Sequence, residues 1–177
     1  DAAISWHPAT FTAVNEAVSL ANTRIDFTFH GKAAHAAGAP ELGRSALDGV
    51  ELMNIGVNYL REHMPDSARV HYAYLDAGGV APNVVQARAT VRQLIRASTL
   101  PELRELVARV RKIADGAALM TETRVTTQVF SGVSNLLGNR PLEEAMQAEM
   151  EKLGPVQFDQ TDRNFAREIQ KTLTDGD

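Results

Sequence analysis

The sequence contains no cysteine among its 177 residues, which excludes disulfides, thiolate nucleophiles and cysteine metal sites. It also lacks any apolar run approaching the roughly 18 to 20 residues that a membrane-spanning helix needs, and no signal-peptide pattern opens it. The formal net charge is −4, so the chain has no general nucleic-acid-binding surface. We therefore expect a cytoplasmic protein with neither nucleic acid nor a membrane as a partner.

The composition that is present is typical of a globular protein. Hydrophobic residues make up 44% and charged residues 23%, enough apolar surface to build a core. The length allows one domain and a part of another. The first residue is Asp1 rather than methionine, and an apolar, strand-like run is already under way at Ile4. We therefore expect this chain to be part of something longer.

Hydrophobic spacing predicts an alternation of strands and helices. Over 24–30 every second residue is apolar, which is the period of a half-buried strand. Apolar residues recur every three or four positions over 46–64, which predicts a helix that ends at Pro65. Residues 70–74 alternate again, and a third strand is expected over 83–95. Two strands in succession suggest a hairpin-like pair.

A second helix and a last strand complete the order. Thr99 and Glu102 can form a capping box at the start of an amphipathic helix over 99–117. Residues 124–129 then alternate as a strand. The order β-α-β-β-α-β over 22–132 predicts an α+β, ferredoxin-like fold, in which a four-stranded antiparallel sheet carries two helices on one face.

The segment 133–177 differs from the predicted sheet domain. It begins with a stretch rich in Gly, Ser and Asn that is typical of a linker, and a polar helix is expected after Pro141. Residues 141–177 carry nine acidic and four basic side chains, so the acidity of the chain belongs to this part. The last dozen residues have little apolar surface to bury, and we expect them to fray.

Two histidines stand out as candidates for chemistry. His7 follows a strand-like run, where metal ligands are often presented, but a zinc site needs three or four converging ligands and no partner ligand is obvious. A plain structural or surface histidine is therefore the default interpretation. His35 lies among small residues over 31–40, which let another molecule approach closely. A binding loop and a solvated connection both remain open for it.

Polar residues on the expected strands offer further candidates. Asn83 can donate its amide to a substrate oxygen, although bonding to its own backbone in a turn is the commoner fate of Asn beside Pro. Arg92 and Arg96 share one face of a strand and can clamp a carboxylate together. Cross-strand ion pairing is the default interpretation of such arginines.

Five ordered motifs together resemble one known family. It is the co-catalytic zinc metallopeptidase family of amidohydrolases, which includes aminoacylases, indole-acetyl-amino-acid hydrolases and glutamate carboxypeptidases. The motifs cover most of the chain and are much more specific together than any one alone. They are Ser5-Trp6-His7-Pro8, Gly31-Lys32-Ala33-Ala34-His35-Ala36-Ala37, Gly43-Arg44-Ser45-Ala46-Leu47-Asp48, Gly78-Gly79-Val80-Ala81-Pro82-Asn83-Val84-Val85, and Arg96 thirteen residues after Asn83.

The resemblance implies a metal-dependent hydrolase of N-acyl amino acids such as aminobenzoyl-glutamate. In this family a catalytic domain with two divalent metal ions, zinc or manganese, is interrupted by a ferredoxin-like lid or dimerisation domain. Residues 22–132 match that domain. Residues 1–21 match the end of a catalytic-domain segment with its linker, and 133–177 match the linker and return helix toward that domain. His7 corresponds to a metal ligand.

The resemblance also assigns roles within the lid domain. His35 matches the catalytic histidine that the family supplies across a homodimer to the partner's active site, where it polarises the scissile carbonyl. Asn83 and Arg96 match residues that hold the carboxylate end of the substrate. Partners implied are a second copy of the chain and a possible second subunit. The other metal ligands and the proton-shuttling glutamate have no counterpart here, so the chain alone is expected to bind no metal and to be inactive.

Two other classes of protein share this strand and helix order. An autonomous ligand-binding or regulatory module is the main alternative, because the fold serves many functions. The motif Trp6-His7-Pro8 favours an interrupted catalytic domain, since a free-standing module has no need of it. An RNA-binding sheet would need aromatic residues on its open face and a basic surface, which the sequence does not indicate.

Overall fold

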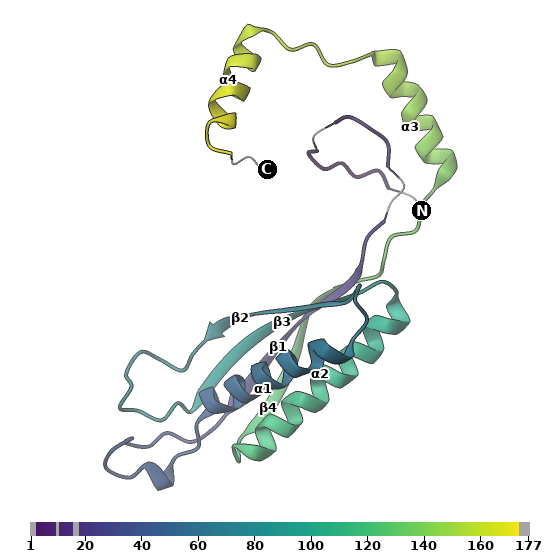
Figure 1. Cartoon of the computed structure of the whole chain (residues 1–177). Coiled ribbons are helices and arrows are strands. Elements are labelled where there is room, and N and C mark those ends of the chain that lie inside the picture. Colours follow the sequence, from purple (N-terminus) through teal and green to yellow (C-terminus); the bar gives the residue numbers. More distant parts are fainter. Residues whose placement is uncertain (1–2, 10, 16–17, 174–177) are drawn as a thin grey trace. The chain divides into compact units, whose positions relative to one another are not determined.

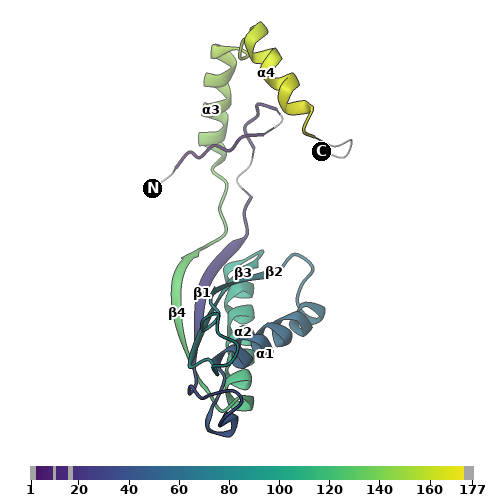
Figure 2. The same cartoon turned by 90° about the vertical axis from the view of Figure 1, so that its left-hand side faces the viewer.

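Four strands form one antiparallel sheet, and two helices cover one of its faces (Figure 1). The sheet order is β2-β3-β1-β4. The elements are β1 (Ala21–His30), α1 (Ala46–Leu60), β2 (Arg69–Asp76), β3 (Arg88–Ala97), α2 (Leu100–Met120) and β4 (Arg124–Val133). Figure 2 shows α1 and α2 on the same side of the sheet. This confirms the predicted α+β, ferredoxin-like fold.

The computed structural model describes residues 3–9, 11–15 and 18–173. They fall into two units, of which Ala17–Leu137 contains the sheet and its helices, here called the sheet unit. Asp1–Glu16 and Gly138–Asp177 form the other, here called the outer unit. Among the described residues, no helix is both long enough and apolar enough to cross a membrane.

The outer unit contains two helices, α3 (Arg140–Leu153) and α4 (Gln160–Gln170). The first is the polar helix predicted after Pro141. The second was not predicted, and Asp159 and Asp162 begin it with reciprocal capping hydrogen bonds. The last dozen residues, which we expect to fray, include the helical residues 166–170. Residues 174–177 lie outside the described part of the chain.

The core lies between the sheet and the two helices. Alternate side chains of β1 and β3 point into it, as the period-2 pattern of β1 predicts. Its largest fully buried members include Phe27, Phe29, Ile25, Met53, Ile95, Val50, Val57, Val91 and Val110. Each such side chain stabilises the fold by about 1.5 to 3 kcal/mol through removal of apolar surface from water.

Local signals in the sequence define the helix ends. Ser45 caps α1 by accepting a hydrogen bond from the Asp48 amide, and the capping box of Thr99 and Glu102 is present at the start of α2. The chain continues from α1 into a short 3-10 helix, Arg61–His63, and leaves helical structure before Pro65. The capping box of α2 and the end before Pro65 were predicted from the sequence.

The expected start of the third strand at Asn83 is wrong, because β3 begins at Arg88. Gly78 and Gly79 have positive φ angles of 87° and 106°, and the chain between Ala81 and Val84 closes a turn, since the Val84 amide donates to the Ala81 carbonyl. Residues 83–85 therefore bond to the loop after β1 rather than continuing the ladder.

Candidate functional site

Two loops meet at one end of the sheet, here called the far end. The loop after β1 and the loop before β3 join in an isolated antiparallel bridge between His35 and Val84. The Ala36 amide donates to the Asn83 carbonyl at 3.0 Å, and the Val85 amide donates to the Ala34 carbonyl at 3.0 Å. The structure therefore brings the predicted residues His35 and Asn83 to one place.

The ring of His35 is held by the backbone of its own loop. Its Nδ1 atom accepts hydrogen bonds from the amides of Ala37 at 3.2 Å and Gly38 at 2.9 Å. A backbone N–H can only donate, so Nδ1 bears the lone pair and the neutral ring carries its proton on Nε2. Because His35 is exposed, this arrangement presents an N–H donor to a group outside the loop.

Asn83 is exposed in the loop that bridges to the His35 loop. Within the described part of the chain its amide makes no hydrogen bond, whereas its backbone carbonyl is used by Ala36. The alternative in which Asn83 bonds its own backbone in a turn therefore finds no support there. An exposed amide with one acceptor and two donor hydrogens can bind a carboxylate or carbonyl oxygen.

Arg96 lies at the opposite end of the sheet. It pairs in register with Asn22 near the start of β1, whereas Arg88 pairs with His30 at the far end. The eight residues from Arg88 to Arg96 span about 26 Å at the usual rise per residue of a strand. Within one chain, Arg96 therefore lies far from His35 and Asn83.

Arg92 and Arg96 share the face of the sheet that the helices leave open, as predicted, but they form no clamp. Arg92 donates to both carboxylate oxygens of Asp26, at 2.6 and 2.8 Å, across the β1–β3 pair. Its guanidinium also lies 4.0 Å from the centre of the Phe130 ring. The pKa of Arg92 is raised, chiefly by its hydrogen bond to Asp26. Arg92 is thus committed to the cross-strand ion pair.

His7 lies in the outer unit and is exposed. Its Nδ1 lies 2.7 Å from the Pro8 carbonyl oxygen, which can only accept, so the proton is on Nδ1 and Nε2 bears the lone pair. That is the form a metal ligand takes. Over 3–9, 11–15 and 18–173, however, no group of three or more His, Asp or Glu side chains converges as a metal site would require. The described residues therefore do not fit the implied two-metal centre.

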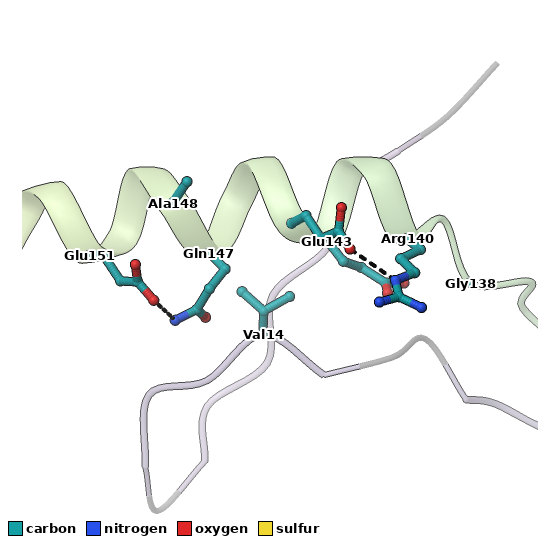
Figure 3. Close-up of a pocket in the computed structure, with 8 residues that line it drawn as sticks. Val14, Gly138, Arg140, Glu143, Gln147, Ala148 and Glu151 are labelled. Atoms are coloured by element: carbon teal, nitrogen blue, oxygen red, sulfur yellow. Dashed lines mark hydrogen bonds and ion pairs between the residues drawn. The ribbon is translucent and has the colours of Figure 1, made fainter.

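A cavity of about 670 Å³ belongs to the outer unit and lies along α3 (Figure 3). Val14 and the side chains of α3 line it. Polar groups of that lining bond to one another: Arg140 pairs with Glu144 at 2.8 Å, and Gln147 donates to Glu151 at 2.8 Å. We assign no chemistry to this cavity.

Comparison with known proteins decides the family. The model of the peptidase dimerisation domain of M20 peptidases matches residues 19–119, more than half of the chain. This chain belongs to the M20 dimerisation domain family. One p-aminobenzoyl-glutamate hydrolase subunit from Escherichia coli (strain K12) is 48% identical to this M20 chain over 177 residues, 37% of that protein. The Xaa-Arg dipeptidase of Homo sapiens is 29% identical over 76% of the chain and 31% of its own length.

Solved structures share the fold of this M20 dimerisation domain. The aminobenzoyl-glutamate utilization protein from Klebsiella pneumoniae matches 78% of the chain and 35% of its own, with a TM-score of 0.63 and 24% identity. A hydantoinase/carbamoylase family amidase from Burkholderia ambifaria matches 80% of the chain and 35% of its own, with a TM-score of 0.66 and 14% identity. The chain thus spans about a third of the length of these relatives. The predicted family is confirmed.

Sequence reasoning missed two features of this M20 domain. A buried amide pair lies in the core: Gln93 donates to Asn54 at 2.9 Å, and Asn54 donates to the Tyr74 hydroxyl at 3.3 Å. An apolar patch, Ile55 and Tyr59 of α1 with Tyr72 and Tyr74 of β2, is exposed. The break in the apolar alternation at Gln93 is a sequence signal for the buried amide pair. The apolar patch has no such signal, because it depends on which strand forms the edge of the sheet.

Proposed function

We propose that this chain is the lid and dimerisation domain of a longer, metal-dependent amidohydrolase that cleaves N-acyl amino acids such as aminobenzoyl-glutamate. The observation that carries the proposal is His35, whose exposed Nε2–H is aimed out of its loop by two backbone hydrogen bonds. The names of the relatives in E. coli and K. pneumoniae support the substrate. The domain contributes substrate-binding and polarising groups rather than a complete active site.

The domain forms a homodimer in this proposal. β2 is an edge strand of the sheet, and edge strands with exposed apolar neighbours favour pairing with another chain. Ile55 and Tyr59, four residues apart on α1, are 48% and 67% exposed, and Tyr72 and Tyr74 are 39% and 44% exposed. A two-fold axis beside β2 would continue the sheet and pack α1 against its copy. A different, second subunit is the alternative partner.

A dimer also resolves the separation of the predicted site residues. About 26 Å along β3 exceeds the length of one small N-acyl amino acid, so His35 and Arg96 of the same chain do not hold the same substrate. In a two-fold dimer, the far end of one sheet can reach the region near Arg96 of the other chain. Each active site then contains His35 and Asn83 from one subunit and Arg96 from the other.

The roles of these groups follow from their chemistry. The Nε2–H of His35 donates to the scissile carbonyl oxygen and holds the negative charge that develops there. The guanidinium of Arg96 binds the substrate carboxylate through paired hydrogen bonds, and the Asn83 amide adds a donor. Two divalent ions, bound by residues outside this chain apart from His7, would supply the hydrolytic chemistry. The 177-residue chain alone is therefore inactive in this proposal.

The test uses the full-length protein and release of glutamate from 4-aminobenzoyl-glutamate, with zinc or manganese added. We expect metal-dependent turnover, and a loss of about 10²- to 10³-fold in kcat for His35→Gln, the usual effect of removing one oxyanion donor. His63→Gln is the matched control, because His63 is also exposed. The proposal fails if the substrate is not cleaved, or if His35→Gln retains the wild-type kcat.

A further inference from the structure

The charged side chains of the sheet are all gathered on one face. The four strands carry ten side chains that are charged or titrate near neutral pH, namely six arginines, two aspartates and two histidines. Strand alternation and register put all ten on the face opposite the helices, here called the open face. The six arginines are Arg24, Arg69, Arg88, Arg92, Arg96 and Arg124.

The acidic groups on this face are already paired. Asp26 binds Arg92 at 2.6 and 2.8 Å. Asp76 binds Arg88 at 2.6 Å and also accepts from the Gly78 amide at 2.8 Å. Six arginines against two aspartates leave four positive charges in excess, whereas the whole chain has a net charge of −4. The open face is therefore a positive surface on an acidic chain.

Several of the arginines lack an internal partner. Over the described residues, the side chains of Arg24, Arg96 and Arg124 make no hydrogen bond or ion pair. The nearby Glu122 pairs with Arg44 at 3.0 Å instead. Arg24 and Arg124 are exposed, and Arg96 is half-buried. Their charges are therefore available to a group that approaches the sheet.

The excess positive charge is densest at the end of the sheet that carries Arg96. Arg69 lies directly opposite Arg96 across the β2–β3 pair, and Arg24 lies two residues along β1 from Asn22, the β1 partner of Arg96. Like charges directly opposite each other destabilise a sheet, so this cluster costs stability. At the far end, Asp76 already pairs with Arg88, and burial, Arg124 and Arg88 hold the pKa of His30 below its usual range. Arg124 therefore carries the excess charge there.

The positive face joins the two places where the proposed function needs substrate contacts. Its densest part carries Arg96, and at its other end Arg124 lies in register with His30, next to the loop that carries His35. A nucleic acid does not fit this surface well, because the Arg92 guanidinium already occupies one face of the Phe130 ring, where a base would stack. A small anion needs no stacking contact, because the electrostatic field of the open face is enough to attract it.

We propose that the open face attracts anionic substrates by long-range electrostatics, so that the full-length protein favours N-acyl amino acids with two carboxylates over those with one or none. This inference rests on the proposed function. Charges of one sign along a surface raise the local concentration of an oppositely charged ligand and its association rate. Arg24 and Arg124 contribute through the field, at a distance from the reacting atoms, whereas Arg96 binds directly.

The test compares the double variant Arg24→Gln/Arg124→Gln with Arg104→Gln/Lys112→Gln in the full-length protein. The control pair removes two positive charges from α2, on the other side of the sheet, where neither side chain has a hydrogen bond or ion pair within the described chain. The probes are 4-aminobenzoyl-glutamate and its uncharged diamide. Hydrolysis and equilibrium binding are both measured at about 0.01 M and at about 1 M salt, where the Debye length is about 30 and 3 Å.

At low salt we expect the open-face double variant to lose about threefold to tenfold in kcat/KM for the dianion, through KM, with kcat unchanged. The loss should disappear at high salt and for the diamide, and the control pair should behave as wild type. Binding of the dianion to the 177-residue chain, followed by NMR shifts of β1, β3 and β4, should weaken in the same pattern.

Equal loss in both double variants would overturn the inference, because net charge alone would then explain it. So would a loss that persists at high salt, or dianion binding that leaves the three strands unshifted. If the wild-type protein binds the dianion on the open face but cleaves no N-acyl amino acid, the proposed function fails while the anion-attracting face stands. If the protein cleaves the substrate but the open-face double variant keeps the wild-type kcat/KM, the proposed function stands and the inference about the open face fails.

Discussion

The Nδ1 atom of His35 accepts a hydrogen bond from the backbone amide of Gly38 at 2.9 Å. With the second bond, from Ala37 at 3.2 Å, this fixes which ring nitrogen carries the proton. The loop after β1 thus holds the His35 N–H donor in a defined direction before any substrate is present. Preorganised donors act more strongly than donors that must reorient during the reaction.

The tautomer of His35 can be measured directly. Long-range 15N–1H NMR correlations of the 177-residue chain at pH 8 should show an unprotonated Nδ1 and a protonated Nε2 for His35. His7, whose Nδ1 bonds the Pro8 carbonyl, should show the opposite tautomer and serves as an internal control. The same tautomer, or an averaged spectrum, for both rings would contradict the proposed geometry.

Two helix glycines should respond in opposite ways to alanine. A Cβ on Gly49 of α1 would overlap the ring of buried Phe29, so Gly49→Ala should lower the free energy of unfolding by about 1 to 3 kcal/mol. A Cβ on Gly116 of α2 meets nothing within 4 Å, so Gly116→Ala should raise it by about 0.4 to 1 kcal/mol. Urea unfolding monitored by circular dichroism measures both. The same sign for both variants would refute the described packing of α1.

Stability should depend on pH through His30. Because its pKa in the folded protein is lowered while that in the unfolded chain stays near 6.5, the unfolded state binds more protons below about pH 6.5. The free energy of unfolding should therefore fall as pH drops from about 6.5 towards the folded pKa. His30→Gln should flatten this slope, and Arg124→Gln should raise the pKa of His30.

The control for His30 is His71→Gln, which removes an exposed histidine from the same face of the sheet. Equilibrium unfolding between pH 4.5 and 7.5 and an NMR titration of the ring protons give the two readouts. A slope that His71→Gln reduces as much as His30→Gln would show that the environment of His30 is not responsible.

Dimer formation should depend on the apolar patch beside β2. Ile55→Glu and Tyr59→Glu place a charge on the exposed face of α1 without touching the core, and we expect either to shift the sedimentation coefficient from dimer towards monomer. Leu119→Glu is the matched control, because Leu119 of α2 is 81% exposed outside the patch. If Leu119→Glu alone abolished the dimer, the interface would lie elsewhere.

Local patterns in the sequence predicted much of the fold. Alternation at 24–30 and the capping box at Thr99 and Glu102 each depend on neighbours in the chain, and the structure has a strand and a helix there. The start of β3 was misplaced because Val84 and Val85 read as strand residues. The Val85 amide instead donates to Ala34 in a distant loop, and Val84 is the bridge partner of His35 there. Such pairing leaves no local signal.

The candidate site was predictable as residue types but not as an arrangement. The motifs identified His35, Asn83 and Arg96, yet nothing in their spacing says that β3 runs away from the loops and separates Arg96 from the other two. The positive open face was equally hidden, because it arises when strands from distant parts of the chain bring Arg24, Arg69 and Arg96 together.

Complementation between two inactive variants tests the central claim most directly. His35→Gln and Arg96→Gln subunits of the full-length protein are mixed, allowed to exchange, and assayed on 4-aminobenzoyl-glutamate. If each site takes His35 from one subunit and Arg96 from the other, a mixed dimer has one intact site, and random exchange should restore about a quarter of wild-type activity. Activity that stays at the level of the separate variants would place both residues in one subunit's site and contradict the account.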